Sequence, residues 1–422
     1  MRRLLYLSLA ALPGCAVMLL AAFAAQASSP VRLGWMITQD VSQSGAAAAS
    51  KGPRIAIDSD GHLHLIWMDD RAGQADLYYA RSVDVGNTWW DGEGIPTTPE
   101  SNQGSLALGS DGTIHACWWE QTSEMYSLLH AERTTGGWSL QPTVVVTGSK
   151  IFYPTIAGAG DYLHVVWSGK PSNDGPSLYY TRKPKIDGTW CDPTAITDTA
   201  PMSMSGRMAV DASDNLHVVW HERTTPYHQV MYVSGTVGIS QTTWSTPITV
   251  SAGLAQNATT PGIDVDDDFV VHVVFAVDVA GQDDTQDIYY ASFPLSNTEG
   301  ISPTAIPGSR VRVSEQLPFW ASPSIALDGL DEVHVVWHGA MDTDLWERIY
   351  YVVSEDHGAN WSPPMAISPD DDWADGFPTI ATDGTLVHVA WQQEGLGSAS
   401  DIYYSHSLPL FTLFPFVVKD YS

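Results

Sequence analysis

Short runs of alternating apolar and polar residues recur along the whole chain. The most regular run has a histidine flanked by apolar residues and usually followed, three residues later, by tryptophan. Seven copies contain His64, His115, His164, His217, His272, His334 and His388. The spacing between successive histidines is 49 to 62 residues. A period of this length, built only from strand patterns, is typical of a β-propeller. The pattern predicts an all-β fold with seven blades, and six blades are the alternative.

The first repeat shows the strands expected in one blade. A strand at Pro53–Asp58 ends in an acidic turn, and the His64 strand follows as its hairpin partner. A third strand is expected at Leu77–Arg81, and a fourth follows Trp89. Four antiparallel strands per repeat make one blade. The expected repeats lie near 53–100, 101–150, 151–202, 203–258, 259–318, 319–373 and 374–407.

The two ends of the chain have different expected roles. Residues 1–27 resemble a bacterial signal peptide, with a basic start, an apolar stretch and Ala25-Gln26-Ala27 as the cleavage signal. Lipidation at Cys15 and an uncleaved anchor are the alternatives. We expect a single secreted or cell-surface propeller over 28–407.

Ring closure requires one more strand beside the last repeat, which lacks an obvious fourth strand. The strand-like segment 33–41 is expected to supply it and to cover the open edge. The apolar C-terminal tail, 408–422, is the competing candidate. Closure by the N-terminal strand is our prediction.

Acidic residues strongly outnumber basic ones. The chain carries 48 Asp and Glu against 19 Lys and Arg, which gives a formal charge of −29. Phosphate backbones and anionic lipid surfaces repel such a protein. We therefore expect neither a nucleic-acid partner nor binding to a membrane surface. No membrane-spanning segment is expected after leader removal. The expected state is a monomer with an extracellular carbohydrate or protein partner.

Two segments share the pattern Ser-x-Asp-x-Gly-x-Thr/Asn-Trp. They contain Asp84 with Trp89 and Asp356 with Trp361. This pattern resembles the Asp-box, or BNR repeat, of the sialidase-like β-propeller superfamily. The resemblance implies a structural turn between the third and fourth strands, on the face opposite an active site. It also implies six blades for sialidases themselves, which differs from the seven repeats counted here.

The repeated histidines are interpreted as structural. In five repeats an aspartate lies five or six residues before the histidine, at the end of the first strand. A histidine opposite such an aspartate is explained by a buried hydrogen-bonded pair. Since a catalytic site breaks symmetry, we assign His64, His164, His217 and His334 to the scaffold.

The loops that differ between repeats are the expected place for function. In related propellers, the loops after the His/Trp strand and those between blades surround one face. Carboxylates beside aromatic rings suit a sugar ligand. The ligand-binding candidates are Arg71, Glu120, Tyr153, Arg223, His338, Trp320 and Trp373. The catalytic candidates, if there is catalysis, are Asp69, Asp70 and Glu222.

The sequence leaves binding and catalysis open. A sialidase needs three arginines, a tyrosine nucleophile with a glutamate, and an acid/base aspartate. Gly52-Pro53-Arg54-Ile55 only partly resembles the segment that supplies the first arginine in that family, and Arg207 fills the same slot in the fourth repeat. We favour a binding propeller, with an exo-acting glycoside hydrolase or a polysaccharide lyase as the alternative.

No cofactor is expected, and calcium is the alternative. Dense acidic turns supply oxygen ligands of the kind that Ca²⁺ prefers. The residues concerned are Asp266, Asp268, Asp370 and Asp372. Neither turn fits a known calcium loop.

Overall fold

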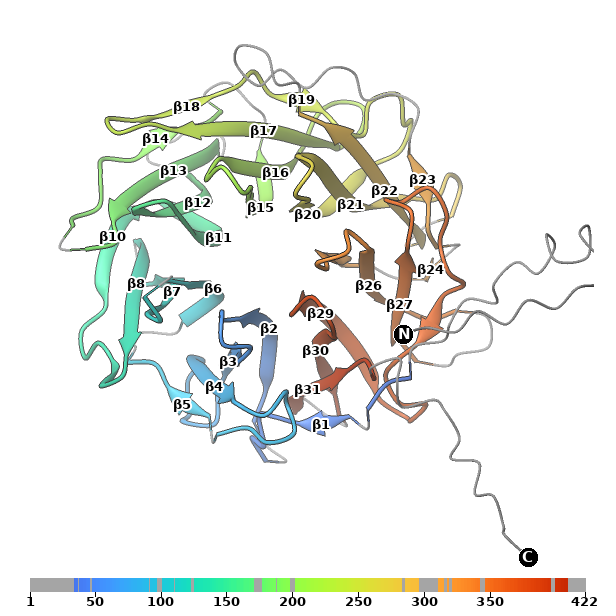
Figure 1. The fold of residues 1–422 in the computed structure, drawn as a ribbon, viewed down its shortest axis with the longest axis horizontal. Helices are drawn as coiled ribbons and strands as arrows, with labels where there is room; N and C mark the ends of the chain where they lie inside the picture. Colours follow the sequence, from blue (N-terminus) through green and yellow to red (C-terminus); the bar gives the residue numbers. More distant parts are fainter. Residues whose placement is uncertain are drawn as a thin grey trace, which may run out of the picture.

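The protein is a ring of seven β-sheets around a central axis (Figure 1). The computed structural model describes residues 34–36, 38–45, 48–90, 92–96, 101–109, 111–122, 125–170, 177–186, 188–197, 202–282, 285–295, 310–314, 317–318, 321–341, 346–395 and 399–408. These residues contain strands and turns and no helix, so none of their segments is a helix that could cross a membrane. The expected all-β propeller is confirmed with seven blades rather than six. The predicted signal peptide, 1–27, lies outside the described residues.

Each blade is an antiparallel sheet whose first strand lies nearest the axis. Blade 1 contains β2 (Ser50–Ile57), β3 (Leu63–Asp69), β4 (Asp76–Ser82) and β5 (Glu93–Gly94). Blade 2 contains β6 (Ser101–Leu108), β7 (Ile114–Gln121), β8 (Tyr126–Thr134), β9 (Gly137–Trp138) and β10 (Thr143–Gly148). Blade 3 contains β11 (Lys150–Ala159), β12 (Tyr162–Lys170), β13 (Ser177–Pro184) and β14 (Thr194–Ala195).

The remaining blades repeat this order. Blade 4 contains β15 (Ser203–Val210), β16 (Leu216–Glu222), β17 (Gln229–Val237), β18 (Thr242–Trp244) and β19 (Ile248–Thr249). Blade 5 contains β20 (Ala258–Val265), β21 (Val270–Asp278), β22 (Thr285–Pro294), β23 (Val311–Arg312) and β24 (Leu317–Pro318). Blade 6 contains β25 (Ser324–Leu327), β26 (Val333–Gly339), β27 (Arg348–Ser354) and β28 (Met365–Ala366). Blade 7 contains β29 (Ala374–Thr382), β30 (Val387–Glu394) and β31 (Ser400–His406), followed by β1 (Gln39–Asp40).

The N-terminal segment closes the ring. Gln39 and Asp40 of β1 pair with Tyr404 and Tyr403 of β31, and Trp35 forms a further bridge to Ser407. The predicted closure by the N-terminal strand is therefore confirmed. Residues 409–422 of the competing tail lie outside the described residues.

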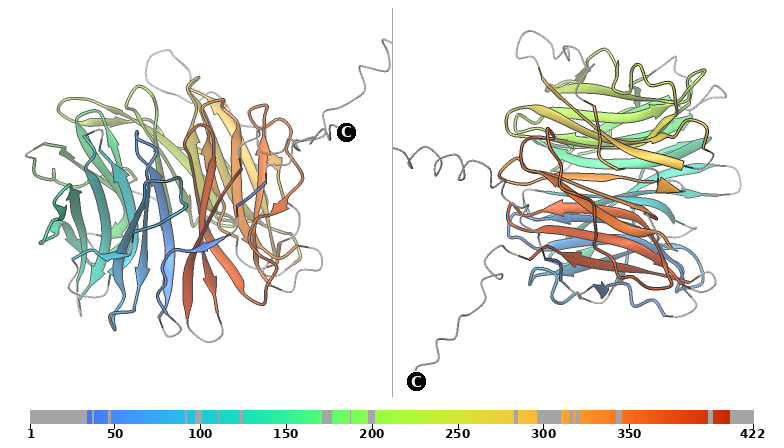
Figure 2. Two further views of the ribbon diagram at one scale, coloured as in Figure 1. Left: turned by 60° about the horizontal axis from the view of Figure 1, so that its bottom comes forward. Right: turned by 90° about the vertical axis from the view of Figure 1, so that its right-hand side faces the viewer.

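The blades have two distinct ends (Figure 2). We call the end with the loops after the second strands and the connections between blades the upper face. The lower face has the hairpins between first and second strands, such as Asp58–His62, and the two Asp-box-like turns. The two faces therefore receive different parts of every repeat.

A histidine–tyrosine pair lies near the lower end of nearly every blade. In six blades a tyrosine hydroxyl of the third strand contacts Nδ1 of the repeated histidine at 2.7–2.8 Å. In blade 2, His130 takes the place of the tyrosine, 3.2 Å from His115. The histidines are all nearly inaccessible to solvent. Each pair thus satisfies polar atoms that the strand pattern buries in the core.

Neighbouring blades are joined through the same tyrosines. The ring of Trp89 in blade 1 meets Tyr404 of blade 7 edge-on at 5.1 Å, and Trp361 meets Tyr290 at 5.0 Å. Trp35 contacts Tyr351 at 5.1 Å in the same way. Such edge-to-face contacts stabilise aromatic packing. The N-terminal segment therefore supplies both a strand and a tryptophan that the last repeat lacks.

The two Ser-x-Asp-x-Gly segments form the same turn. In the first, Ser82 Oγ donates to Asp84 Oδ1 and accepts from Gly86 N–H, while Thr88 N–H donates to Asp84 at 2.8 Å. The segment from Ser354 repeats these contacts. Gly86 has a φ of 81°, and a Cβ on it would lie 2.2 Å from Tyr404. Glycine is therefore required at this position by both the backbone and the packing.

Candidate functional site

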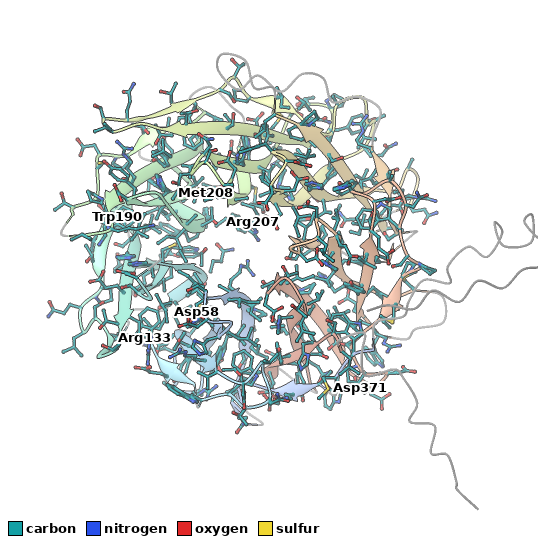
Figure 3. All side chains as sticks on the ribbon, in the orientation of Figure 1. Asp58, Arg133, Trp190, Arg207, Met208 and Asp371 are labelled. Carbon is teal, nitrogen blue, oxygen red and sulfur yellow. The ribbon has the colours of Figure 1, made fainter. Side chains whose placement is uncertain are left out.

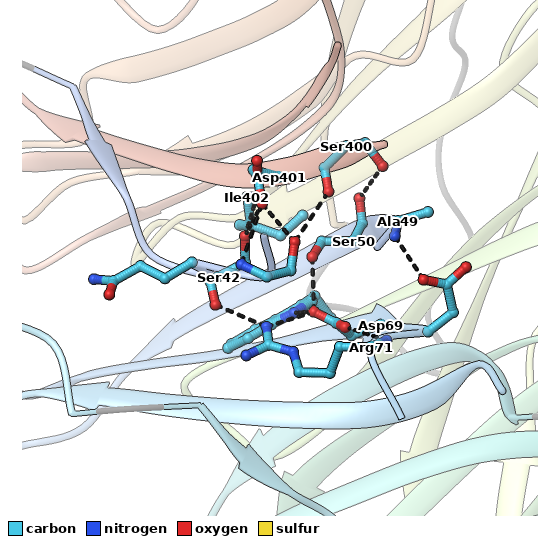
Figure 4. A network of polar contacts seen from close by, with 12 residues as sticks. Ser42, Ala49, Ser50, Asp69, Arg71, Ser400, Asp401 and Ile402 are labelled. Atoms are coloured by element: carbon cyan, nitrogen blue, oxygen red, sulfur yellow. Dashed lines mark hydrogen bonds and ion pairs between the residues drawn. The ribbon is translucent and has the colours of Figure 1, made fainter. Parts of the chain in front are cut away.

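The predicted acids of blade 1 belong to the ring-closure network rather than to an open site (Figure 4). Asp69 is fully buried and accepts from Trp67 Nε1 at 3.0 Å and Ser50 Oγ at 2.8 Å. Its carboxylate also pairs with Arg71 at 2.5 Å, and Arg71 donates to Ser42 O. Asp70 accepts from Ala49 N–H at 2.6 Å. These groups hold the N-terminal segment against blade 1, so they are poorly placed to reach a ligand.

Electrostatics agree with a structural use of Asp69. Burial alone would raise the pKa of this carboxyl group, but hydrogen bonds from Arg71 and Trp67 outweigh the burial and lower it. The ion Asp69 forms is thus stabilised by fixed partners. A general acid or base needs free access to the substrate, which these contacts do not leave.

Two further predicted acids are partners of buried indoles. Glu120 and Glu222 each lie two residues after the repeated tryptophan of the same strand. Trp118 Nε1 donates to Glu120 at 2.9 Å, and Trp220 Nε1 donates to Glu222 at 3.2 Å. Burial raises the pKa of Glu222, and the indole hydrogen bond lowers it by less. The sequence Trp-x-Asp/Glu is therefore a repeated structural contact.

The other predicted ligand residues are distributed around the upper face. Arg223 is exposed and lies near His228, whose pKa is lowered by burial and then by the charge of Arg223. Tyr153 is half-buried, and its N–H donates to Gln103 Oε1 at 2.9 Å. Trp320 lies outside the described residues. Arg71, Arg223 and a tyrosine do not gather in one site within the described part of the chain.

The predicted calcium ligands are only partly available. Asp266 accepts from His272 Nε2 at 3.0 Å and from Val270 N–H at 2.7 Å. Asp268, Asp370 and Asp372 are exposed. Within the described ranges, acid–histidine groups with closely spaced ligand atoms occur instead on the lower face, at Asp58, Asp60 and His62 and at Asp328, Glu332 and His334. Arg81 lies 4.0 Å from Asp58, which opposes a cation there.

The structural histidines make the expected contacts with aspartates and an additional contact with tyrosines. His64 and His217 contact the predicted aspartates, Asp58 and Asp211, at 3.0 and 3.1 Å. His334 contacts Asp328 at 3.5 Å. His164 has no such aspartate and contacts Ala159 O at 3.3 Å. Sequence analysis did not identify the tyrosine that contacts the other ring nitrogen. That tyrosine lies on the third strand, 15 residues after the histidine in the case of His217 and Tyr232.

A pair of glutamates lies on the upper face between blades 6 and 7. Glu347 immediately precedes β27, and its carbonyl accepts from Asp375 N–H at 2.9 Å. Glu394 ends β30 and is paired with Ala374, the neighbour of Asp375. The two residues therefore flank the same short stretch of β29. Burial and, to a smaller extent, the negative charge of Glu394 together raise the pKa of Glu347 to about 7.

Aromatic residues lie on the segments next to this glutamate pair. Trp346 is 47% exposed and Phe377 is 49% exposed. The Phe377 ring lies 5.5 Å from that of His338, and Phe377 N–H donates to His338 Nδ1 at 3.3 Å. A Cβ placed on Gly395 would lie 3.0 Å from the ring of Trp373, so the lack of a side chain there lets the indole cover the strand end.

We call these six residues the blade 6–7 site: His338, Trp346, Glu347, Trp373, Phe377 and Glu394. His338 and Trp373 were among the predicted ligand residues, and the structure brings them to the same edge. No repeat pattern pointed to Glu347, because it lies in the loop between the second and third strands, where the residues differ from blade to blade. Asp375, beside the site, is 1% exposed, and burial raises its pKa to about 7.

The inner strands carry one further irregularity at the upper face. Six of them contain a break in strand pairing beside a residue with positive φ. These residues are Gly52, Gln103, Tyr153, Ser205, Thr260 and Phe377. Bulges of this kind redirect side chains at the rims of closed sheets. Phe377 of the blade 6–7 site lies at such a bulge.

Comparison with known proteins supports the fold. No family model matches the chain, and no curated protein matches it. Among solved structures, an ulvan lyase, a polysaccharide lyase, has a TM-score of 0.61 at 11% identity and covers 87% of this chain and 95% of its own. The α-L-arabinanase of Penicillium chrysogenum has a TM-score of 0.53 at 12% identity, with 90% and 100% covered. A protein of unknown function from Dyadobacter fermentans has a TM-score of 0.56 at 15% identity, with 90% and 100% covered.

These similarities define the class of the protein. The chain is a seven-bladed β-propeller that shares its architecture with glycoside hydrolases and a polysaccharide lyase. At such low identities, the likeness concerns the fold alone. The Asp-box assignment stays a resemblance carried by two segments.

Proposed function

We propose that the protein is a secreted propeller that binds an extracellular glycan at the blade 6–7 site. The observation that carries this proposal is the combination of exposed aromatic rings with two adjacent carboxylates. A sugar packs its C–H face on an aromatic ring, while its hydroxyl groups donate to carboxylates. A few polar groups among aromatic residues are typical of ligand sites.

The geometry gives the two kinds of side chain separate tasks. Trp346 and Phe377 are exposed and offer open ring surface, whereas Trp373 is half-buried against Gly395. Glu394 is oriented by Gln392 Nε2, which donates to it at 3.0 Å. Rings therefore supply contact area, and oriented carboxylates supply selectivity for hydroxyl groups. Arg71, Glu120 and Glu222 take no part in this arrangement.

A glycan array with the secreted protein tests the proposal. Trp346→Ala and Phe377→Ala should each weaken binding of any glycan found by about tenfold, in line with typical losses at buried aromatic contacts. Trp90→Ala is the matched control, because Trp90 is 53% exposed but lies beside Arg81 on the lower face. Equal losses in all three variants, or no glycan bound by the parent, would refute the site.

Hydrolysis is a second candidate function, favoured by the glutamate pair. Glu347 has a pKa near 7, whereas Glu394 is exposed. Two carboxyl groups in unlike environments are the usual acid and base of glycosidases. Glu347 would donate the proton, and Glu394 would act as base or nucleophile.

A panel of chromogenic glycosides, together with a uronate polysaccharide, separates the two functions. Turnover that falls at least a hundredfold in both Glu347→Gln and Glu394→Gln would show hydrolysis. New unsaturated sugar ends from the uronate polymer would instead show a lyase. Binding without any turnover supports the first proposal.

A further inference from the structure

Two arginines lie on the inner strands of blades 1 and 4. Arg54 on β2 is paired with Ile66, and Arg207 on β15 is paired with Val219, so both occupy the same position of their blades. Blades 1 and 4 are three steps apart in a ring of seven, which places them on nearly opposite sides. Figure 3 labels Arg207 at the inner edge of the ring.

The local backbone explains this placement. Gly52 and Ser205 have φ of 60° and 55° at the bulges that precede the two arginines. Each guanidinium then folds back on its own strand: Arg54 Nη1 donates to Pro53 O at 2.7 Å. Arg207 Nη1 donates to Gly206 O at 3.0 Å. Each guanidinium keeps further N–H donors for another partner.

Charge at this position is confined to these two blades. The equivalent residues of the other blades are small and uncharged: Ser105, Thr155, Gly262, Ser324 and Thr379. Five blades thus have a small, uncharged residue at this position, and two blades have an arginine. The change breaks the symmetry that marks the scaffold.

The arginines have no carboxylate within ion-pair distance in the described part of the chain. Burial and, to a smaller extent, the positive charge of Arg207 together lower the pKa of Arg54 to about 9. Asp264, the acid on the neighbouring inner strand, is engaged by the N–H groups of Val265 and Leu327, both at 2.9 Å. Like charges in a desolvated setting are costly without a counterion. An otherwise acidic protein therefore keeps an uncompensated positive pair at its centre.

We propose that Arg54 and Arg207 form a binding site for a tetrahedral oxyanion at the centre of the ring. Guanidinium groups form charge-assisted, often bidentate hydrogen bonds with oxyanions. A sulfate or phosphate group presents oxygens in opposite directions and can contact both walls, whereas a carboxylate presents both oxygens to one side. The group arrives either as the inorganic ion or as an ester on a sugar.

Thermal unfolding and calorimetric titration with sodium sulfate at constant ionic strength, balanced with sodium chloride, test the site. The parent protein should show saturable stabilisation by sulfate beyond that of chloride. Arg54→Gln and Arg207→Gln should each weaken sulfate binding at least tenfold. Arg54→Lys keeps the charge without the fork and should be intermediate. Arg312→Gln is the control with the same charge change, since Arg312 lies on the outermost strand of blade 5.

A sulfated disaccharide and its unsulfated counterpart distinguish the two sources of the group. Binding of inorganic sulfate that both arginine variants lose assigns the site to the free ion. Binding of the sulfated sugar alone, again lost in both variants, assigns it to a glycan substituent. No saturable response to either sulfated probe, or equal responses in parent and arginine variants, overturns the proposal. Failure of the blade 6–7 site leaves these readouts unchanged, because inorganic sulfate does not require it.

Discussion

The lower and upper ends of the blades follow opposite rules. At the lower end, the same histidine–tyrosine contact recurs in six blades within 0.1 Å, and an Asp often completes it. At the upper end, the equivalent positions differ from blade to blade. Glu347 and Glu394 lie beside blades 6 and 7, and arginine at the inner-strand position is confined to blades 1 and 4.

This difference separates the scaffold from the proposed sites. Most repeated polar groups are satisfied by one another, so they stabilise the blade rather than bind a ligand. Among the unrepeated groups are carboxyl and guanidinium groups with shifted pKa values and aromatic rings that are exposed. Such features are common at ligand sites. Asp69 is an instructive exception, because it lies at the upper end but is used in ring closure.

Asp69→Asn should have the largest effect on stability. The amide cannot match the charge of Arg71, and it leaves the Trp67 and Ser50 donors poorly satisfied. Breaking a buried pair costs about 3–5 kcal/mol of unfolding free energy, which urea denaturation measures. Asp70→Asn, which weakens only the contact to Ala49, should cost about 1 kcal/mol. A stable Asp69→Asn protein that no longer binds glycan would show instead that Asp69 belongs to the ligand site.

Tyr232→Phe and Tyr351→Phe should cost similar amounts although they lie in different blades. Each removes the hydroxyl that contacts a buried histidine, His217 or His334, at 2.7–2.8 Å. An unpaired buried polar atom costs about 1–3 kcal/mol. Tyr289→Phe is the control, since its ring stacks on Phe275 and no hydroxyl bond to a histidine is lost. Very unequal costs in urea denaturation would show that the repeats are not equivalent scaffold units.

Acid should destabilise the lower end. Burial would raise the pKa of Asp211, but hydrogen bonds from His217 and Asn215 outweigh it and lower the value to about 2. A depressed carboxyl pKa contributes stability that is present above about pH 4 and is lost as the pH falls toward 2. Urea denaturation between pH 6 and 2 should show this loss, with a shallower slope in Asp211→Asn. An unchanged slope would mean that the His–Asp pairs contribute nothing.

Glu347→Gln should have the smallest effect on stability, and it should stabilise the protein rather than destabilise it. The pKa of Glu347 is raised to about 7 in the folded protein. Ionisation of this group therefore opposes folding once the pH exceeds its pKa in the unfolded chain, and the effect is complete above pH 7. The variant should gain about 0.5–1 kcal/mol at pH 8 and nothing at pH 4, after allowance for solvent screening. Thermal unfolding at both pH values measures the difference. A loss of stability at pH 8 would show that Glu347 has a structural partner like Asp69.

The sequence was sufficient for the architecture because each blade repeats the same local rules. Alternating apolar residues, a turn and a repeated histidine every 49 to 62 residues define strands that can only be buried by neighbouring blades. The missing strand of the last repeat and the spare strand before the first also predicted closure. These signals lie within one repeat or compare one repeat with another.

Which upper-face residues stay available was decided by contacts between distant segments. Asp69 and Glu347 are both acids near the ends of strands, and in the local sequence only the Trp-x-Asp pattern of Asp69 separates them. Ser50 of the adjoining strand β2 donates to Asp69, and ring closure brings Ser42 O to Arg71, the ion-pair partner of Asp69. Glu347 instead meets the charge of Glu394 where blades 6 and 7 adjoin. The pattern of strands follows from residues that are neighbours in the sequence. The desolvation and the charge state of a side chain depend on every group packed near it in the fold. The fold could therefore be derived from the sequence, and the state of each carboxylate and arginine only from the tertiary structure.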